Sequence, residues 1–177
     1  MNGHRSLPND VLQLLQSARY LHLATADADA TPSVSLMNYT FVEEQGEPMV
    51  ILTTPADTTK YANVARNPKV SLLVHGFGTP RSVSRGQAAE DSSLTQLLAN
   101  LNQSAVASLS ATLDGRARIL HAGEQAQHYK QLHCANNPTG QGCYIDSPAI
   151  KVILVQISGC RISDPQNHVE RWGKGDA

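Results

Sequence analysis

Hydroxyl-bearing side chains and one lysine cluster between positions 35 and 60 of this sequence. Ser35 and Asn38 fall in one predicted strand. Thr53 and Thr54 end another strand, and Lys60 follows in the first turns of a predicted helix. Proteins hold phosphate groups with hydroxyls, backbone N–H groups at a helix N-terminus and a fixed cation. The spacing therefore indicates a site for a flat, phosphorylated cofactor. Ser and Thr also suit strands and many helix lysines face solvent, so a purely structural role stays open.

Three predicted strands position these residues. Residues 20–26 alternate apolar and polar side chains, and an Asp-rich turn follows. Residues 33–43 form the second predicted strand and residues 49–54 the third, so the three make an antiparallel meander. Neither face of the second strand is purely polar. A strand of this kind separates a core from a second buried surface, which is either a partner or a ligand.

The remaining elements complete a mainly β (α+β) pattern. Asp57 is the expected N-cap of the helix that carries Lys60, and Asn67-Pro68 ends that helix. Further strands are predicted at 69–75, 106–120 and 149–162, with helices near 9–19 and 123–135. Asp114-Gly115 is either a hairpin turn or a bulge. We expect an antiparallel barrel with flanking helices. A parallel α/β sheet is the alternative, weakened because no helix separates the first three strands.

Composition narrows the classes of function. The chain has 177 residues, enough for a single domain, 1–177, and residues 78–104 look like an insertion that contains a helix. A net charge of -1 argues against nucleic acid as a partner, and no apolar run is long enough to cross a membrane. Cys134, Cys143 and Cys160 form no close pair, which favours reduced thiols and a cytoplasmic location.

Searches for other kinds of site give negative results. His128 and His133 are five residues apart on a predicted helix, so they do not share a face as a metal-ligating pair would. We interpret them as solvent-facing residues and expect no metal. The sequence has no dinucleotide-binding turn and no nucleophile elbow. No residue stands out as a general acid or base, so the catalytic residues are unknown at this stage.

The stretch 21–77 resembles the flavin-binding half of the pyridoxamine 5′-phosphate oxidase-like split-barrel family. The insertion at 78–103 and the segment 164–172 resemble a poorly characterised fungal branch of that family. The matching segments are Leu23–Thr25, Pro32–Asn38, Ile51–Thr54, Lys60 and Asn67–Val74. Ser110 to Arg118 is similar to the strand that follows in the family. The resemblance implies a six-stranded antiparallel Greek-key split β-barrel with flanking helices.

The same resemblance implies FMN as cofactor and assigns roles to individual residues. Ser35, Leu36, Met37 and Asn38 would line the flavin, largely through backbone groups. Thr54, with Thr53 beside it, would touch the ribityl phosphate region, and Lys60 would pair with the phosphate. Ser110 would reach FMN from the other subunit, because family members are typically homodimers with two cofactors at the interface. Trp172, the only tryptophan, would stack over the flavin or anchor the tail at the dimer interface.

Two departures from the family pattern bear on the activity. Pyridoxamine phosphate oxidases carry Arg where this chain has Ser35, and an Arg-Lys pair where it has Thr59-Lys60. Two strong bidentate phosphate contacts are thereby lost. The resemblance thus implies an FMN-binding oxidoreductase without pyridoxamine phosphate oxidase activity, with an unknown small-molecule substrate. The alternative is a non-enzymatic relative that has lost tight flavin binding and binds another small ligand or acts as a scaffold.

Overall fold

The computed structural model describes residues 6–76, 109–138, 147, 149–164 and 168–173. Within them, one antiparallel sheet has the strand order β2-β1-β5-β6-β7-β4-β3, with β8 paired to β7. The elements are α1 (Asn9–Ser17), β1 (Tyr20–Ala26), β2 (Pro32–Asn38), β3 (Thr40–Glu44), β4 (Glu47–Pro55), α2 (Thr59–Arg66), β5 (Lys69–His75), β6 (Ser110–Leu120), α4 (Glu124–Asn136), β7 (Ile150–Ser163) and β8 (Val169–Gly173).

The predicted class, an antiparallel split barrel with flanking helices, is confirmed, and the parallel alternative is wrong. The predicted count of six strands is corrected to eight in the described part of the chain. The single strand expected at 33–43 is two strands, because β2 pairs with β1 whereas β3 pairs with β4. The short β8 was not predicted, since its residues are mostly exposed and carry little apolar periodicity.

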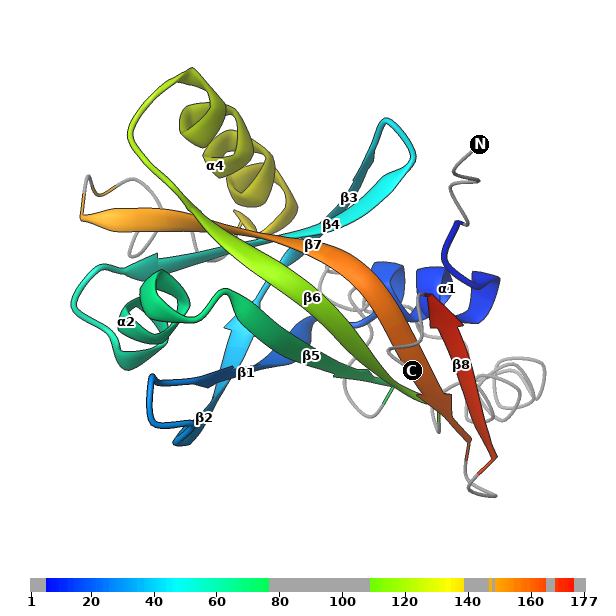
Figure 1. Cartoon of the computed structure of the whole chain (residues 1–177). Helices are drawn as coiled ribbons and strands as arrows, with labels where there is room; N and C mark the ends of the chain where they lie inside the picture. The colour runs from blue at the N-terminus through cyan, green and yellow to red at the C-terminus, as the bar shows by residue number, and fades with distance from the viewer. Residues whose placement is uncertain (1–5, 77–108, 139–146, 148, 165–167, 174–177) are drawn as a thin grey trace, which may run out of the picture.

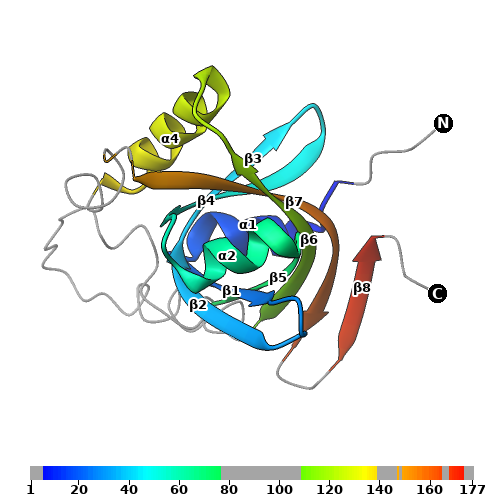
Figure 2. The same ribbon diagram turned by 60° about the vertical axis from the view of Figure 1, so that its left-hand side comes forward.

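Strand alternation and two helices build the core inside the barrel. Figure 2 looks into the ring of strands and shows α2 across its opening with α1 behind it. One side of α1 is buried against the inner faces of the strands. The largest fully buried apolar side chains of this inner core include Leu14, Leu15, Leu21, Leu23, Leu52, Leu72, Leu113 and Ile153. Burial of each such side chain stabilises the fold by about 1.5–3 kcal/mol.

A second apolar cluster lies outside the barrel, beneath α4. Figure 1 shows α4 packed over one end of the long strands β6 and β7. The cluster consists of Ile51, Leu120, Tyr129, Val152 and Leu154. Among the described helices, only α4 covers the outer face of the sheet, and it does so at this end.

The Asp114-Gly115 pair lies within one continuous strand, so the hairpin alternative is wrong. The register between β6 and β7 shifts between these two residues, and Ser158 of β7 has no partner on β6. A Cβ atom at Gly115 would lie only 2.8 Å from the backbone oxygen of Gln156. A glycine is therefore required for the two strands to approach closely beside this bulge.

The chain passes from one half of the sheet to the other at Tyr39. This residue is 0% exposed, and its Oη lies 2.6 Å from the carbonyl oxygen of Leu15 and 3.0 Å from that of Ala18. The hydroxyl thus donates to carbonyl groups at the C-terminal end of α1, which have no partner within the helix. This contact ties α1 to the point where β2 ends and β3 begins.

Some expectations lie outside the described residues, namely the insertion at 78–104 with its helix and the environment of Cys143. Among the helices that are described, none is long and apolar enough to span a bilayer.

We predict that Tyr39→Phe lowers the free energy of unfolding by about 1–3 kcal/mol. The substitution keeps the buried ring and leaves the α1 carbonyls without their donor. Urea denaturation followed by circular dichroism measures this change. Tyr20→Phe, which alters an exposed ring on β1, is the control and should have an effect below about 0.5 kcal/mol. Equal effects of the two substitutions would contradict the role assigned to Tyr39.

Candidate functional site

The elements that carry Ser35, Thr54 and Lys60 meet at one end of the barrel. β2 and β4 contact each other there, although they are not neighbours in the hydrogen-bonded order of the sheet. α2 follows β4 after a short turn and packs against β1, β2 and β6. The start of α2 therefore lies close to β2 and to the end of β4. This is where a phosphorylated ligand was expected from the sequence.

Two threonines build the start of α2. The N-cap is Thr58, so the prediction of Asp57 as cap is wrong by one residue. The Thr58 hydroxyl donates to the carbonyl oxygen of Pro55 at 3.0 Å and accepts from the Tyr61 N–H at 3.4 Å. Because its only proton is used in this way, the Thr54 hydroxyl, 2.9 Å away, must donate to it. Thr54 is only 2% exposed and thus holds the helix start in place.

The N-terminus of α2 carries unpaired donors. The backbone N–H groups of Thr59 and Lys60 precede the first intrahelical bond and have no hydrogen-bond partner in the described residues. The Lys60 side chain is partly exposed, and no carboxylate of those residues lies within 4.0 Å of its ammonium. The first turn of α2 contains no acidic residue. The helix dipole and this cation together favour an anion at the position.

β2 presents hydroxyl groups to the inside of the barrel and apolar groups to the outside. Ser35 pairs with Leu23 of the inner core and is half-buried. Ser33 pairs with Thr25, whose Oγ1 accepts a hydrogen bond from Asn63 of α2 at 3.0 Å. A row of hydroxyls therefore leads from β2 towards α2.

The other β2 candidates divide between the two sides of the strand. Met37 is part of the inner core, whereas Leu36 is 60% exposed and Asn38 is also exposed. On β4, Thr53 is half-buried and pairs with Val152 of the cluster beneath α4. Thr53 and Thr54 consequently face opposite sides of the sheet. Their two hydroxyl groups therefore do not point to the same ligand position on β4.

Ser110 and Trp172 are not brought to this end within one chain. Ser110 pairs with His75, roughly 20 Å along β5 from Lys69, where that strand begins after α2. Trp172 pairs with Cys160 and packs partly buried against the inner core of its own barrel. Contact of Ser110 with a ligand at α2 would require a second copy of the chain.

Sequence reasoning missed Lys151, which is placed opposite Thr54 in the register between β4 and β7. Lys151 is partly buried and lies two residues before Ile153 of the inner core on β7, so its side chain is on the inner face of the strand. Its pairing with Thr54 places it at the end of the barrel near α2. No signal along the chain pairs residue 151 with residue 54. Only the strand register makes Lys151 a second candidate cation at this end of the barrel.

The interpretation of His133 as a solvent-facing residue is wrong. His133 is 1% exposed, and its Nδ1 lies 3.1 Å from Oγ1 of Thr40. Asn137 donates to Thr40 Oγ1 at 3.2 Å and to the carbonyl oxygen of Tyr39 at 3.3 Å. This network fastens the end of α4 to β3. The described residues contain no group of three His, Cys, Asp or Glu side chains arranged to bind a metal.

A second contact fastens the middle of α4. Tyr129 donates to the Glu44 carboxylate at 2.7 Å. Burial raises the pKa of Tyr129, as do its hydrogen bond to Glu44 and the charge of that carboxylate, while the charge of Arg118 acts in the opposite direction. The phenol is therefore protonated at neutral pH and remains a donor to Glu44.

Comparisons with known proteins identify the family of the chain. A sequence profile described as pyridoxamine 5′-phosphate oxidase matches residues 7–142. A pyridoxamine 5′-phosphate oxidase homolog of Saccharomyces cerevisiae is 31% identical over 195 residues, which cover 96% of each chain. Another homolog, from Schizosaccharomyces pombe, is 31% identical over 186 residues, covering 99% of this chain and 96% of its own. A solved heme binding protein of Mycobacterium smegmatis has a similar fold, with a TM-score of 0.63 at 17% identity. The matched region covers 96% of this chain and 60% of that protein, and the likeness is one of fold alone.

We predict that Thr58→Ala lowers the free energy of unfolding by about 1 kcal/mol, because α2 loses its N-cap and Thr54 loses its acceptor. Urea denaturation measures the change. Thr59→Ala is the matched control, since this exposed neighbour makes no side-chain hydrogen bond in the described residues, and its effect should stay below about 0.5 kcal/mol. A larger loss for Thr59→Ala than for Thr58→Ala would show that the cap is misassigned.

Proposed function

Because the chain belongs to the pyridoxamine 5′-phosphate oxidase family, we propose that it binds FMN and acts as a flavin-dependent oxidoreductase. The phosphate binds at the N-terminus of α2, close to β2 and to the end of β4. The observation that carries this proposal is a set of donors there without partners in the described residues, namely two backbone N–H groups and the Lys60 ammonium. A phosphate monoester is the ligand chemistry that this donor set fits.

The residues around α2 divide the work of holding FMN. Lys60 and the first N–H groups of the helix hold the phosphate, and Thr54 keeps the helix start rigid through Thr58. Ser35 and the backbone of β2 lie along the adjoining strand, where they line the flavin. When bound, FMN supplies the hydride or electron transfer chemistry, and the protein contributes binding and orientation. The substrate in this proposal is a small molecule that reaches the flavin.

Pyridoxamine phosphate oxidase activity itself is not part of the proposal. Neither Ser35 nor Thr59 can form the bidentate contacts of a guanidinium with a phosphate. Lys60 is a point charge, so binding rests on fewer directional hydrogen bonds. We therefore expect FMN to bind reversibly, in the micromolar range. We also propose a cytoplasmic location, which the buried Cys160 thiol outside any disulfide supports.

The active form in this proposal is a homodimer. On the outer face of β1, β2 and β5, apolar side chains are exposed without a covering helix in the described residues: Val34 by 64%, Leu36 by 60%, Tyr20 by 43% and Leu73 by 38%. His22 pairs with both Leu36 and Leu73 in the strand register, so these residues form one continuous patch. A patch of this kind marks a protein interface. A second copy seated on it supplies Ser110 to the cofactor of the first.

The second candidate function is a non-enzymatic binding protein that has lost flavin affinity. The missing guanidinium groups at positions 35 and 59 favour it. A solved protein of similar fold is described as a heme binding protein, so heme is the second ligand to test. Calorimetric titrations with FMN, pyridoxal phosphate and heme separate the two candidates.

We predict that Lys60→Ala raises the dissociation constant for FMN roughly tenfold or more, because the phosphate loses its only fixed cation on α2. Quenching of FMN fluorescence during titration with protein measures the constant. Arg66→Ala, which removes a charge from the other end of α2, is the matched control and leaves the constant within about twofold. Unchanged FMN affinity in Lys60→Ala, or no flavin binding by the native chain, would refute the proposal and favour the second candidate.

We further predict that Leu36→Asp converts the dimer into a monomer, because it places a charge in the centre of the apolar patch. Light scattering after size-exclusion chromatography gives the mass of each variant. Val169→Asp is the control: Val169 is also an exposed apolar residue, 55% accessible, but lies on β8, away from the patch. A native chain that is monomeric at micromolar concentration contradicts the dimer.

A further inference from the structure

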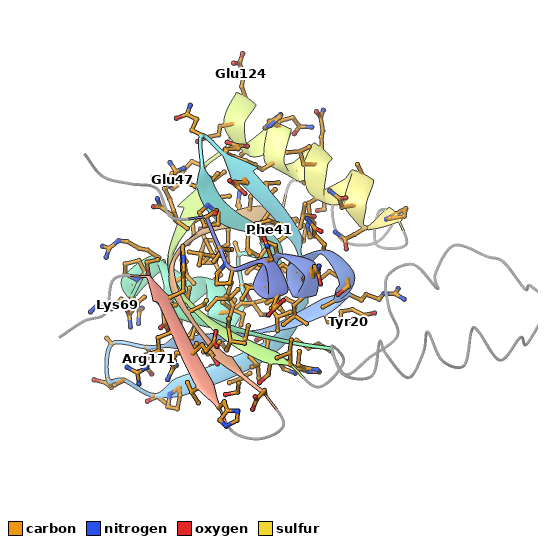
Figure 3. All side chains as sticks on the ribbon, turned by 90° about the vertical axis from the view of Figure 1, so that its right-hand side faces the viewer. Tyr20, Phe41, Glu47, Lys69, Glu124 and Arg171 are labelled. Carbon is orange, nitrogen blue, oxygen red and sulfur yellow. The ribbon has the colours of Figure 1, made fainter. Side chains whose placement is uncertain are left out.

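A pocket of about 370 Å³ lies on the outer face of the sheet, over β4, β6 and β7. Its lining residues are Glu47, Met49, Arg116, Ala117, Arg118, Leu154 and Gln156. None of them belongs to α2 or β2, which carry the proposed FMN site. Its volume is within the range of small-molecule sites. The pocket lies over β4, β6 and β7, whereas the exposed apolar patch lies over β1, β2 and β5. Figure 3 shows Glu47 of the pocket and Tyr20 of the patch on opposite sides of the view.

Two guanidinium groups dominate the charge of this pocket. Arg116 and Arg118 are two residues apart on β6, so their Cα atoms lie about 7 Å apart and their side chains share the outer face. Both are exposed, and neither has an ion-pair or hydrogen-bond partner in the described part of the chain. Lys69 is the partner of Arg116 across the β5–β6 ladder and adds a third cation at the edge. Two neighbouring guanidinium groups with no partner in the described residues can bind two oxygens of one anionic group or two acidic groups.

The floor of the pocket is apolar. Met49 and Leu154 lie on the outer face of β4 and β7, next to the cluster beneath α4. Gln156 pairs with Arg116 on one side and Met49 on the other, and its amide donates to the Glu47 carboxylate. Glu47 is thereby bound by Gln156 rather than by either arginine. The pocket thus combines available cations with an apolar surface.

We propose that this pocket binds a small organic anion, with a phosphate or carboxylate head on Arg116 and Arg118 and an apolar body on Met49 and Leu154. The anionic head takes the directional hydrogen bonds of the guanidinium groups. The apolar body removes the methionine and leucine side chains from water. Inorganic phosphate alone, which lacks a body of this kind, binds more weakly. The site works independently of FMN.

Phenyl phosphate is the probe, and the methionine methyl groups report where it binds. The sequence contains three methionines, and of the described ones Met49 lines the pocket while Met37 is buried in the inner core. In a chain labelled with [methyl-¹³C]methionine, phenyl phosphate should shift the Met49 resonance with a dissociation constant of roughly millimolar or tighter. A shift of Met37, which lies on β2 beside the proposed FMN site, would report binding at that site instead. The double variant Arg116→Gln/Arg118→Gln should weaken this binding tenfold or more, because the anion loses its charge-assisted hydrogen bonds to the two guanidinium groups.

Three controls decide between the pocket and other anion sites. Arg161→Gln/Arg171→Gln removes two exposed arginines that face each other across β7 and β8, outside the pocket, and should leave the titration unchanged. Lys60→Ala should also leave it unchanged, since it affects only the FMN site. Phenol and inorganic phosphate should each bind more weakly than phenyl phosphate. The proposal is overturned if Met49 does not respond below about 10 mM, or if either control variant weakens binding as much as the Arg116/Arg118 variant.

Discussion

The chain crosses between the two halves of the sheet at Tyr39 and Thr40, and hydrogen bonds from two helices hold it there. The Tyr39 hydroxyl donates to α1, and its carbonyl accepts from Asn137 at the end of α4. Thr40 bonds His133 of the same helix. These groups are buried, so each would be costly to leave unpaired. Because the crossing ends β2 at Asn38, β4 contacts β2 without a ladder between them, and the barrel remains split beside α2.

The split determines what the site can hold. The observed arrangement leaves the Thr59 and Lys60 N–H groups and the Lys60 ammonium without protein partners in the described residues. Thr54 and Thr58 keep that helix start rigid from the side. In the described residues, the outer face of β1, β2 and β5 is apolar and exposed, and Arg116 and Arg118 line the pocket over β4, β6 and β7 without an ion-pair or hydrogen-bond partner.

Local patterns in the sequence were sufficient for some of these features. Alternation of Leu21 and Leu23, and of Val70, Leu72 and Val74, predicted buried strands, and the helix that carries Lys60 follows directly from Asn67-Pro68 at its end. Tyr39 was missed because an apolar residue in a strand pattern does not reveal that the strand changes partner. His133 was read as exposed because α4 has little apolar periodicity, and its burial depends on Thr40, 93 residues earlier. Lys151 and the Arg116–Arg118 pocket depend on strand register, which no local pattern encodes.

A crystal structure of the chain grown with FMN tests the central claim most directly. The account predicts the FMN phosphate within hydrogen-bond distance of the Lys60 ammonium and the first N–H groups of α2, with the flavin along β2. A phosphate bound away from α2, or crystals that exclude FMN at saturating concentration, would contradict it.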